Sequence, residues 1–260
     1  MEYLYSCFLI IALISFIFIT IILKKHQKAT MIIIFSLGSV IFIWKAIEFT
    51  CYAFNNGAVP VEISHIAYFL TGGIIVVGYK KLYFTGGIFA FVAGLGYLIG
   101  GVVSPNSIIN SLPPATFILG IISHLTLLFL GINLLFNVEK YNLKDIYIPF
   151  IFFAITLIYV YLAGEGYIYD KVSFVKTTFI YRLIHGEILN YFNSSANNMT
   201  LSWFLAALVY ILFFVVIFGT NYLNNLIFKK RENNRFNIGI CPLIIYLINR
   251  KKSLNNEKNI

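Results

Sequence analysis

Charged residues are scarce in this sequence. Asp, Glu, Lys and Arg make up only 11% of its 260 residues, whereas 60% are hydrophobic. A soluble domain carries about 25% charged residues, so the composition excludes that class and predicts one polytopic membrane domain. Much of the net charge of +9 lies in short loops and after Asn224, where it serves membrane topology. No basic groove indicates a nucleic-acid partner.

Cysteine is also rare, and the three cysteines, Cys7, Cys51 and Cys241, form no CxxC pair and no Cys/His spacing typical of a metal site. The sequence contains no GxGxxG, P-loop or GxSxG motif, so we expect no metal, nucleotide or haem cofactor. The basic residues near the N-terminus follow the first apolar run instead of preceding it, which predicts a first membrane helix and not a signal peptide.

Seven apolar runs follow one another, each near the ~20 residues that a bilayer crossing needs. They are residues 5–23, 30–54, 60–79, 82–103, 114–137, 146–163 and 201–223. The sequence therefore predicts an all-α fold, with a seven-transmembrane-helix bundle at residues 1–223. A basic, polar tail at residues 224–260 follows it.

The distribution of lysines predicts the orientation. The loops after the first, third and fifth runs carry lysines, whereas the short loops after the second and fourth carry none. Positive residues remain on the cytoplasmic side, so the N-terminus is predicted outside and the C-terminus in the cytoplasm. The connection 164–200 is then exterior, and the helical spacing of Val172, Val175, Phe179 and Leu183 predicts one helix lying at the membrane interface.

The run 82–103 is rich in glycine. Its glycines are Gly86, Gly87, Gly94, Gly96, Gly100 and Gly101. Small residues at helical spacing predict close packing against neighbouring helices. A smooth surface for a substrate tail is the alternative interpretation.

Strongly polar residues inside the apolar runs are few, and they form the candidate site. They are Lys45, Glu48, Glu62, Ser64, His65 and His124. Ionisable groups within a membrane usually mark functional sites, and the predicted topology puts all six in the outer half. At 1.5 Å per residue, His124 lies ~15 Å below Pro114 and Ser64 only ~6 Å below Pro60.

Two interpretations of these residues stay open. In the structural one, Lys45 and Glu48 form a buried ion pair, and the remaining groups form hydrogen bonds between helices. In the functional one, a serine near a histidine, with a carboxylate to orient that histidine, has the residue types that acyl transfer needs. Lys45 would then bind the phosphate of a lipid headgroup.

Several segments occur in a characteristic order across residues 40–137. They are Trp44-Lys45-x-x-Glu48, Pro60-Val61-Glu62-Ile63-Ser64-His65-Ile66, Lys80-Lys81-Leu82-Tyr83, Gly86-Gly87, Ser104-Pro105-Asn106, Pro113 and His124. This ordered set resembles the YwaF family of bacterial multi-pass integral membrane proteins. That family is similar to a eukaryotic multi-pass protein described as a phospholipid acyltransferase.

The resemblance implies site residues. The nucleophile of the eukaryotic protein is assigned to the cysteine of a P-L-H-L-C-like motif, and its base to a histidine two helices later. Those positions match Ser64 and His124 here. More distant relatives, with a threonine and a histidine, are described as membrane hydrolases of fatty-acid esters. This sequence differs from the pattern at three positions. Ser64 replaces the motif cysteine, Glu62 replaces the first motif histidine, and Asn106 replaces an acidic residue. A serine hydroxyl depends on its base more than a cysteine thiol does.

The leading hypothesis is a membrane-lipid acyltransferase or lipid-ester hydrolase of the bacterial cytoplasmic membrane. Its catalytic residues would be Ser64 as nucleophile, His124 as base and Glu62, or alternatively Glu48, as the orienting carboxylate. Lys45, Glu48 and His65 would bind substrate. The alternative is a non-catalytic membrane protein that binds or transports a small solute or a lipid, or has a structural role. A membrane lipid is the expected substrate or ligand, and the oligomeric state stays open.

Overall fold

The computed structural model describes residues 2–23, 25–56, 59–103, 114–169, 172–189 and 198–228, and the regular elements within those ranges are all helical. The helices are α1 (Glu2–Leu23), α2 (Gln27–Asn56), α3 (Ile63–Val77), η1 (Lys80–Leu82), α4 (Tyr83–Val103), α6 (Pro114–Asn133), η2 (Leu134–Val138), η3 (Leu143–Ile146), α7 (Tyr147–Gly164), α8 (Val172–Lys176), α9 (Phe179–Ile184) and α11 (Met199–Ile227). The predicted all-α fold is therefore confirmed. The segment Ser104-Pro105-Asn106, Pro113 and the tail from residue 229 onward lie outside the described residues.

Five helices in the described ranges are long and apolar enough to cross a membrane. They are Gln27–Cys51, Lys80–Gly100, Ile118–Val138, Leu143–Gly164 and Met199–Ile227. Two shorter apolar stretches, Ile10–Leu23 and Ile63–Val77, accompany them. Large apolar side chains such as Phe204, Ile211 and Phe218 of α11 are exposed, which suits a surface that faces lipid. The chain is thus a multi-pass membrane protein by the length and composition of its helices, and the count of seven spans stays a prediction.

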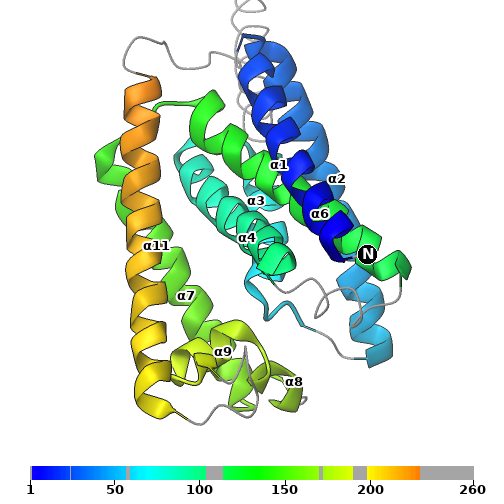
Figure 1. The fold of residues 1–260 in the computed structure, drawn as a ribbon, viewed down its shortest axis with the longest axis vertical. Coiled ribbons are helices and arrows are strands. Elements are labelled where there is room, and N and C mark those ends of the chain that lie inside the picture. The colour runs from blue at the N-terminus through cyan, green and yellow to red at the C-terminus, as the bar shows by residue number, and fades with distance from the viewer. Residues whose placement is uncertain are drawn as a thin grey trace, which may run out of the picture.

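The helices form a bundle in which α3 and α4 lie between two groups (Figure 1). On one side of them lie α1, α2 and α6, and on the other side lie α7 and α11. The closest packing joins α2 to α3, α3 to α4, and α4 to α6. We call the end of the bundle where α3 begins, beside α8 and α9, the cap end. The opposite end, where α11 finishes, is the tail end.

Glycine brings α4 close to α6. A Cβ atom at Gly94 would lie 2.6 Å from the backbone nitrogen of Leu128 and 2.8 Å from the carbonyl oxygen of His124. A side chain there would therefore push the two helices apart. Gly96, by contrast, faces open space. The prediction of close packing is thus confirmed at Gly94 and at Gly87, where a Cβ atom would lie 2.9 Å from the side chain of Leu135, while Gly96 and Gly100 meet nothing within 4 Å.

We call α8 and α9 the cap, and the cap differs from the single interfacial helix that we predicted. Two short helices, α8 and α9, replace it, because Thr178 caps the start of α9. Its Oγ1 accepts a hydrogen bond from the Tyr181 backbone N–H at 3.4 Å and donates one to the Val175 carbonyl at 2.7 Å. The apolar side chains of the cap pack on the start of α3 and the end of α7. The buried members of this cluster are Val61, Val160, Ala163, Val175, Ile180 and Tyr181.

At the tail end, α6 continues into the π-helical segment η2, and Asn224 ties α11 to it. The Asn224 Nδ2 atom donates hydrogen bonds to the carbonyl oxygens of Leu135 (2.6 Å) and Glu139 (2.8 Å), and its Oδ1 accepts one from the Tyr141 backbone N–H (3.0 Å). These partners explain why α11 extends to Ile227, beyond the predicted end at residue 223.

Candidate functional site

Lys45 is the buried cation of the site. The α2 helix places it one turn before Glu48, and its Nζ donates a hydrogen bond to Oε2 of Glu48 at 2.7 Å. Lys45 is only 7% exposed, whereas the Glu48 side chain is 31% exposed. The ammonium also lies 4.7 Å from the ring centroid of Trp44 and 4.9 Å from that of Tyr68. A carboxylate and two ring faces thus offset the cost of burying this charge.

His124 is held from three sides. Its Nδ1 lies 2.8 Å from the Gly120 carbonyl oxygen one turn earlier in α6, so that this nitrogen donates and Nε2 is the acceptor. The ring stacks on Tyr97 of α4, with centroids 3.7 Å apart and planes at 10°. The Tyr68 hydroxyl of α3 lies 3.2 Å from Nδ1 and 3.4 Å from Nε2. Tyr68 therefore donates its proton toward Nε2.

His65 lies one turn before Tyr68 on α3. Its ring meets the ring of Phe49 edge to face, with centroids 4.9 Å apart. It interacts electrostatically with Lys45 and with His124, which brings the three groups into one cluster. Its Nδ1 is buried, and among the described residues it has no hydrogen-bond partner. We call Lys45, Glu48, His65, Tyr68 and His124 the polar cluster.

Ser64 and Glu62 do not join the other predicted residues. Within the part of the chain that the structure describes, no hydrogen bond joins Ser64 to His124, and Tyr68 holds that position instead. Because Ser64 lies four residues before Tyr68, it occupies the same face of α3 one turn nearer the cap end. The carboxylate of Glu62 accepts a backbone hydrogen bond from Phe179 in the cap. The catalytic roles of Ser64, His124 and Glu62 stay predictions.

The sequence prediction missed Tyr68 and Tyr97. Tyr68 could have been found, since it lies three residues after His65 and four after Ser64, which puts it on their face of a helix. Tyr97 carries no such signal, because its stacking on His124 depends on how α4 packs against α6. In the described ranges, no group of three or more His, Cys, Asp or Glu side chains could hold a metal ion.

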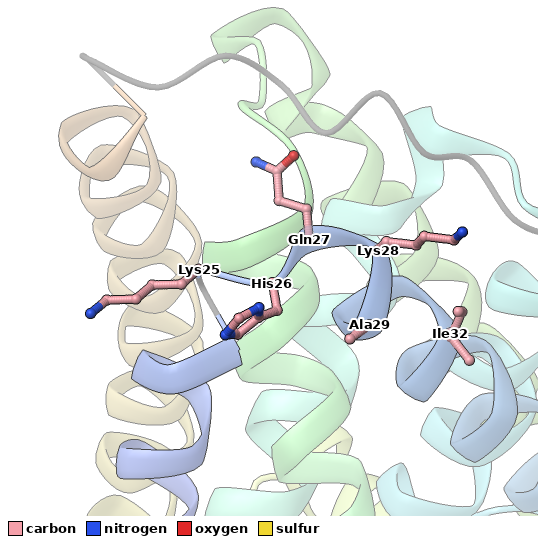
Figure 2. A pocket seen from close by; sticks show the side chains of 6 residues that line it. All are labelled: Lys25, His26, Gln27, Lys28, Ala29 and Ile32. Carbon is pink, nitrogen blue, oxygen red and sulfur yellow. The ribbon is translucent and has the colours of Figure 1, made fainter.

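Two of the hollows among the described residues are candidate binding sites. The first, of about 560 Å³, lies at the turn between α1 and α2. Figure 2 shows Lys25 and Lys28 extending from it in opposite directions, so their charges do not converge on a ligand.

The second hollow, of about 400 Å³, lies between α3 and α7, and we call it the α3–α7 groove. The chain around α3 contributes Pro60, Ile66, Phe69 and Leu70, and α7 contributes Phe152, Ile155, Thr156 and Tyr159. Phe69 separates the groove from the polar cluster, because its ring contacts Phe49, which in turn contacts His65.

Comparisons of this chain with protein-family models, with curated proteins and with solved structures find no match.

Proposed function

We propose that this multi-pass membrane protein binds an anionic group, the phosphate of a membrane lipid or of a small solute, at the polar cluster. The observation that carries the proposal is the buried, unpartnered Nδ1 of His65 beside the Lys45 ammonium, among the described residues. An ion pair that only stabilises α2 is complete without such a neighbour. Leaving a buried donor without a partner costs about 1–3 kcal/mol, which a bound phosphate oxygen would offset.

The unequal exposure of Lys45 and Glu48 indicates how the phosphate would enter. Glu48 is the exposed member of the pair, so its carboxylate can turn outward while Lys45 stays buried. The phosphate then accepts a hydrogen bond from Nζ of Lys45 and a second one from an Nδ1–H of His65. Hydrogen bonds between an ammonium and a phosphate are the strong, charge-assisted kind.

Variants of the ion pair test this proposal. Binding of phosphatidylglycerol to the purified full-length protein is measured by titration for Lys45→Gln and for Glu48→Gln. The first variant is expected to weaken binding at least about tenfold, equivalent to about 1.4 kcal/mol. The second is expected to strengthen it, because the competing carboxylate is gone. If both variants lower the melting temperature alike and neither changes lipid affinity, the pair is structural and the proposal fails.

Inorganic phosphate distinguishes the two sources of the anion. Competition by inorganic phosphate against the lipid would assign the site to a small anionic solute. Binding of the lipid that inorganic phosphate does not reduce would assign it to a lipid headgroup, which is the outcome we expect.

A second candidate function is acyl transfer or ester hydrolysis on the bound lipid. It is favoured by the tautomer of His124, whose Nδ1 donates to Gly120 and whose Nε2 is an acceptor, so that Nε2 can take a proton once Tyr68 turns away from it. Ser64 Oγ would attack the ester carbonyl and give its proton to Nε2. His124 would then protonate the departing alcohol, leaving the acyl group on Ser64 for water or a second lipid alcohol. The resemblance to the YwaF family supports this candidate, and we propose membership of that family together with it.

A serine-directed lipid probe tests the second candidate. The probe is expected to label the wild-type protein on Ser64 and to leave Ser64→Ala unlabelled. Absence of labelling, together with unchanged lipid turnover in Ser64→Ala, rejects catalysis and leaves the binding function.

We also propose that the cap end lies outside the bacterial cytoplasmic membrane and that the tail end lies in the cytoplasm. The lysine distribution supports this orientation. In a chain whose native cysteines are replaced, Lys176→Cys in the cap is expected to react with an impermeant maleimide in intact cells. Lys144→Cys at the tail end should react only after the cells are permeabilised, and the opposite pattern reverses the orientation.

A further inference from the structure

The α3–α7 groove has the length of one leaflet of a membrane. Along α3 and the residues just before it, the groove extends from Pro60 to Leu70, and on α7 it extends from Phe152 to Tyr159. At 1.5 Å per residue these segments are on the order of 10–15 Å long. The hydrocarbon core of a bilayer is about 30 Å thick, so the groove is roughly as long as one half of that core.

The volume of the groove is smaller than that of a helical segment of the same length. A helical segment of the same length, with a diameter of about 10 Å, would fill on the order of 1,000 Å³. The groove measures about 400 Å³.

The lining of the groove suits hydrocarbon. Ile66, Phe69 and Leu70 form one wall, and Phe152 and Ile155 form part of the other. The hydroxyl of Thr156 already donates a hydrogen bond to the Phe152 carbonyl at 2.9 Å, so it needs no polar group from a ligand. Lipid tails surround these helices, and apolar contact with a tail costs no buried polar group.

Basic groups lie near the groove in two places, in the polar cluster behind Phe69 and in the cap. Phe69 and Phe49 connect the wall of the groove to His65. At the cap end, Ile66 and Tyr159 pack against the apolar cluster beneath α8 and α9, and Lys176 at the end of α8 adds an exposed positive charge. An acyl chain in the groove thus has basic groups on both sides of the end that faces the cap, which suits a phosphate-bearing headgroup.

We propose that the α3–α7 groove holds one acyl chain of a phospholipid whose headgroup lies at the cap end. The inference rests on the proposed function for the binding of the headgroup at Lys45. It adds the binding site of the acyl chain. It also adds a route by which the lipid enters laterally from the membrane, between α3 and α7.

Photocrosslinking tests the site. The full-length protein is reconstituted with a phosphatidylglycerol that carries a diazirine in its acyl chain, and then moved into detergent to dilute loosely held lipid. After irradiation, the adducts are mapped by mass spectrometry. We expect them on residues of the groove such as Ile66, Leu70 and Phe152.

Two isoleucines of α7 supply a matched pair of variants. Ile155 lines the groove and is 55% exposed, whereas Ile158 lies outside it and is 59% exposed. Ile155→Trp is expected to fill the groove and remove most of the adducts, while Ile158→Trp retains them. Equal adducts in the two variants, adducts spread evenly over the exposed face of α7, or crosslinks between two copies through α3 and α7 would each overturn the proposal.

A short-chain, water-soluble phosphatidylglycerol separates this inference from the proposed function. Its binding is expected to depend on Lys45 and to be unchanged in Ile155→Trp. If Lys45-dependent binding persists but the wild type gives no adducts in the groove, the acyl-chain site is wrong and the proposed function stands. If the adducts are found but no binding depends on Lys45, the proposed function is wrong and the acyl-chain site stands.

Discussion

The hydroxyl of Tyr68 lies 3.2 Å from Nδ1 and 3.4 Å from Nε2 of His124, and it joins α3 to α6 inside the bundle. Because Nδ1 donates to the Gly120 carbonyl, Nε2 is the atom that needs a donor. Tyr68 supplies that donor while its ring faces the Lys45 ammonium at 4.9 Å. One side chain therefore connects the cation of the polar cluster to its innermost histidine.

Tyr68→Phe is expected to lower stability by about 1–3 kcal/mol, because it leaves Nε2 of His124 buried without a donor while keeping the ring over Lys45. Thermal unfolding in detergent measures the effect. Tyr222→Phe is the control, since Tyr222 is 64% exposed. Equal melting temperatures for the two variants would contradict the hydrogen bond. If the catalytic hypothesis holds, Tyr68→Phe also frees Nε2 for Ser64 and increases labelling by the serine-directed probe.

Gly94→Ala is expected to destabilise the protein by about 1–3 kcal/mol, the usual cost of overpacking. The added Cβ would lie 2.8 Å from the His124 carbonyl oxygen and would push α6 away from α4. Gly96→Ala is the matched control on the same helix. It meets nothing within 4 Å and is expected to stabilise by about 0.5–1 kcal/mol, because alanine favours a helix over glycine. A shift of the same sign in both variants would show that α4 and α6 do not approach closely at Gly94.

Asn224→Ala is expected to cost about 2 kcal/mol, because it removes the hydrogen-bond donor of the buried Leu135 carbonyl and of the part-buried Glu139 carbonyl. Asn225→Ala is the control, since the Asn225 amide bonds only to Asn221 of its own helix among the described residues. Hydrogen exchange at residues 134–141 should accelerate in the first variant alone. Unchanged exchange in Asn224→Ala would mean that α11 is held to η2 by other contacts.

Tyr181 gives the cap a pH dependence. Burial, together with the 2.6 Å hydrogen bond that its hydroxyl donates to Glu165, raises the pKa of Tyr181 above its usual value of 10.0. Since the folded pKa is the higher one, the contact stabilises fully below the unfolded value and is lost as the pH rises through the folded value. Thermal unfolding followed from about pH 8 to about pH 11 should show a loss of stability at the alkaline end.

Tyr181→Phe should reduce this alkaline loss and cost about 1 kcal/mol at neutral pH. Tyr167→Phe, at a residue that is 74% exposed, should leave the pH profile of the wild type intact. An identical alkaline loss in wild type and Tyr181→Phe would assign the effect to another group.

The local sequence was enough to predict the helices of the bundle. The run 82–103 became α4 at Tyr83–Val103, and the run 30–54 became α2 at Gln27–Asn56. These agree because an apolar run of this length forms its backbone hydrogen bonds within itself, whatever lies around it. The contact of Lys45 with Glu48 has the same local origin, since residues three apart share one face of a helix.

The cap shows where local information was insufficient. The helical spacing from Val172 to Leu183 predicted one helix. That spacing does not show whether Thr178 continues the helix or ends it by accepting a capping hydrogen bond. The outcome depended on burying Val175 and Ile180 against Val61, a residue more than a hundred positions earlier in the chain.

Composition and the spacing of polar residues thus determined a helical membrane protein with a few ionisable groups in its bundle. Tertiary structure alone decided that Tyr68 meets His124, that Glu62 bonds to Phe179 in the cap, and that a groove separates α3 from α7. The physical reason is that rotating or sliding one helix by a single residue changes which side chains meet across an interface. The sequence of each helix hardly constrains that rotation, whereas the close fit at Gly94 and the bonds of Asn224 fix it.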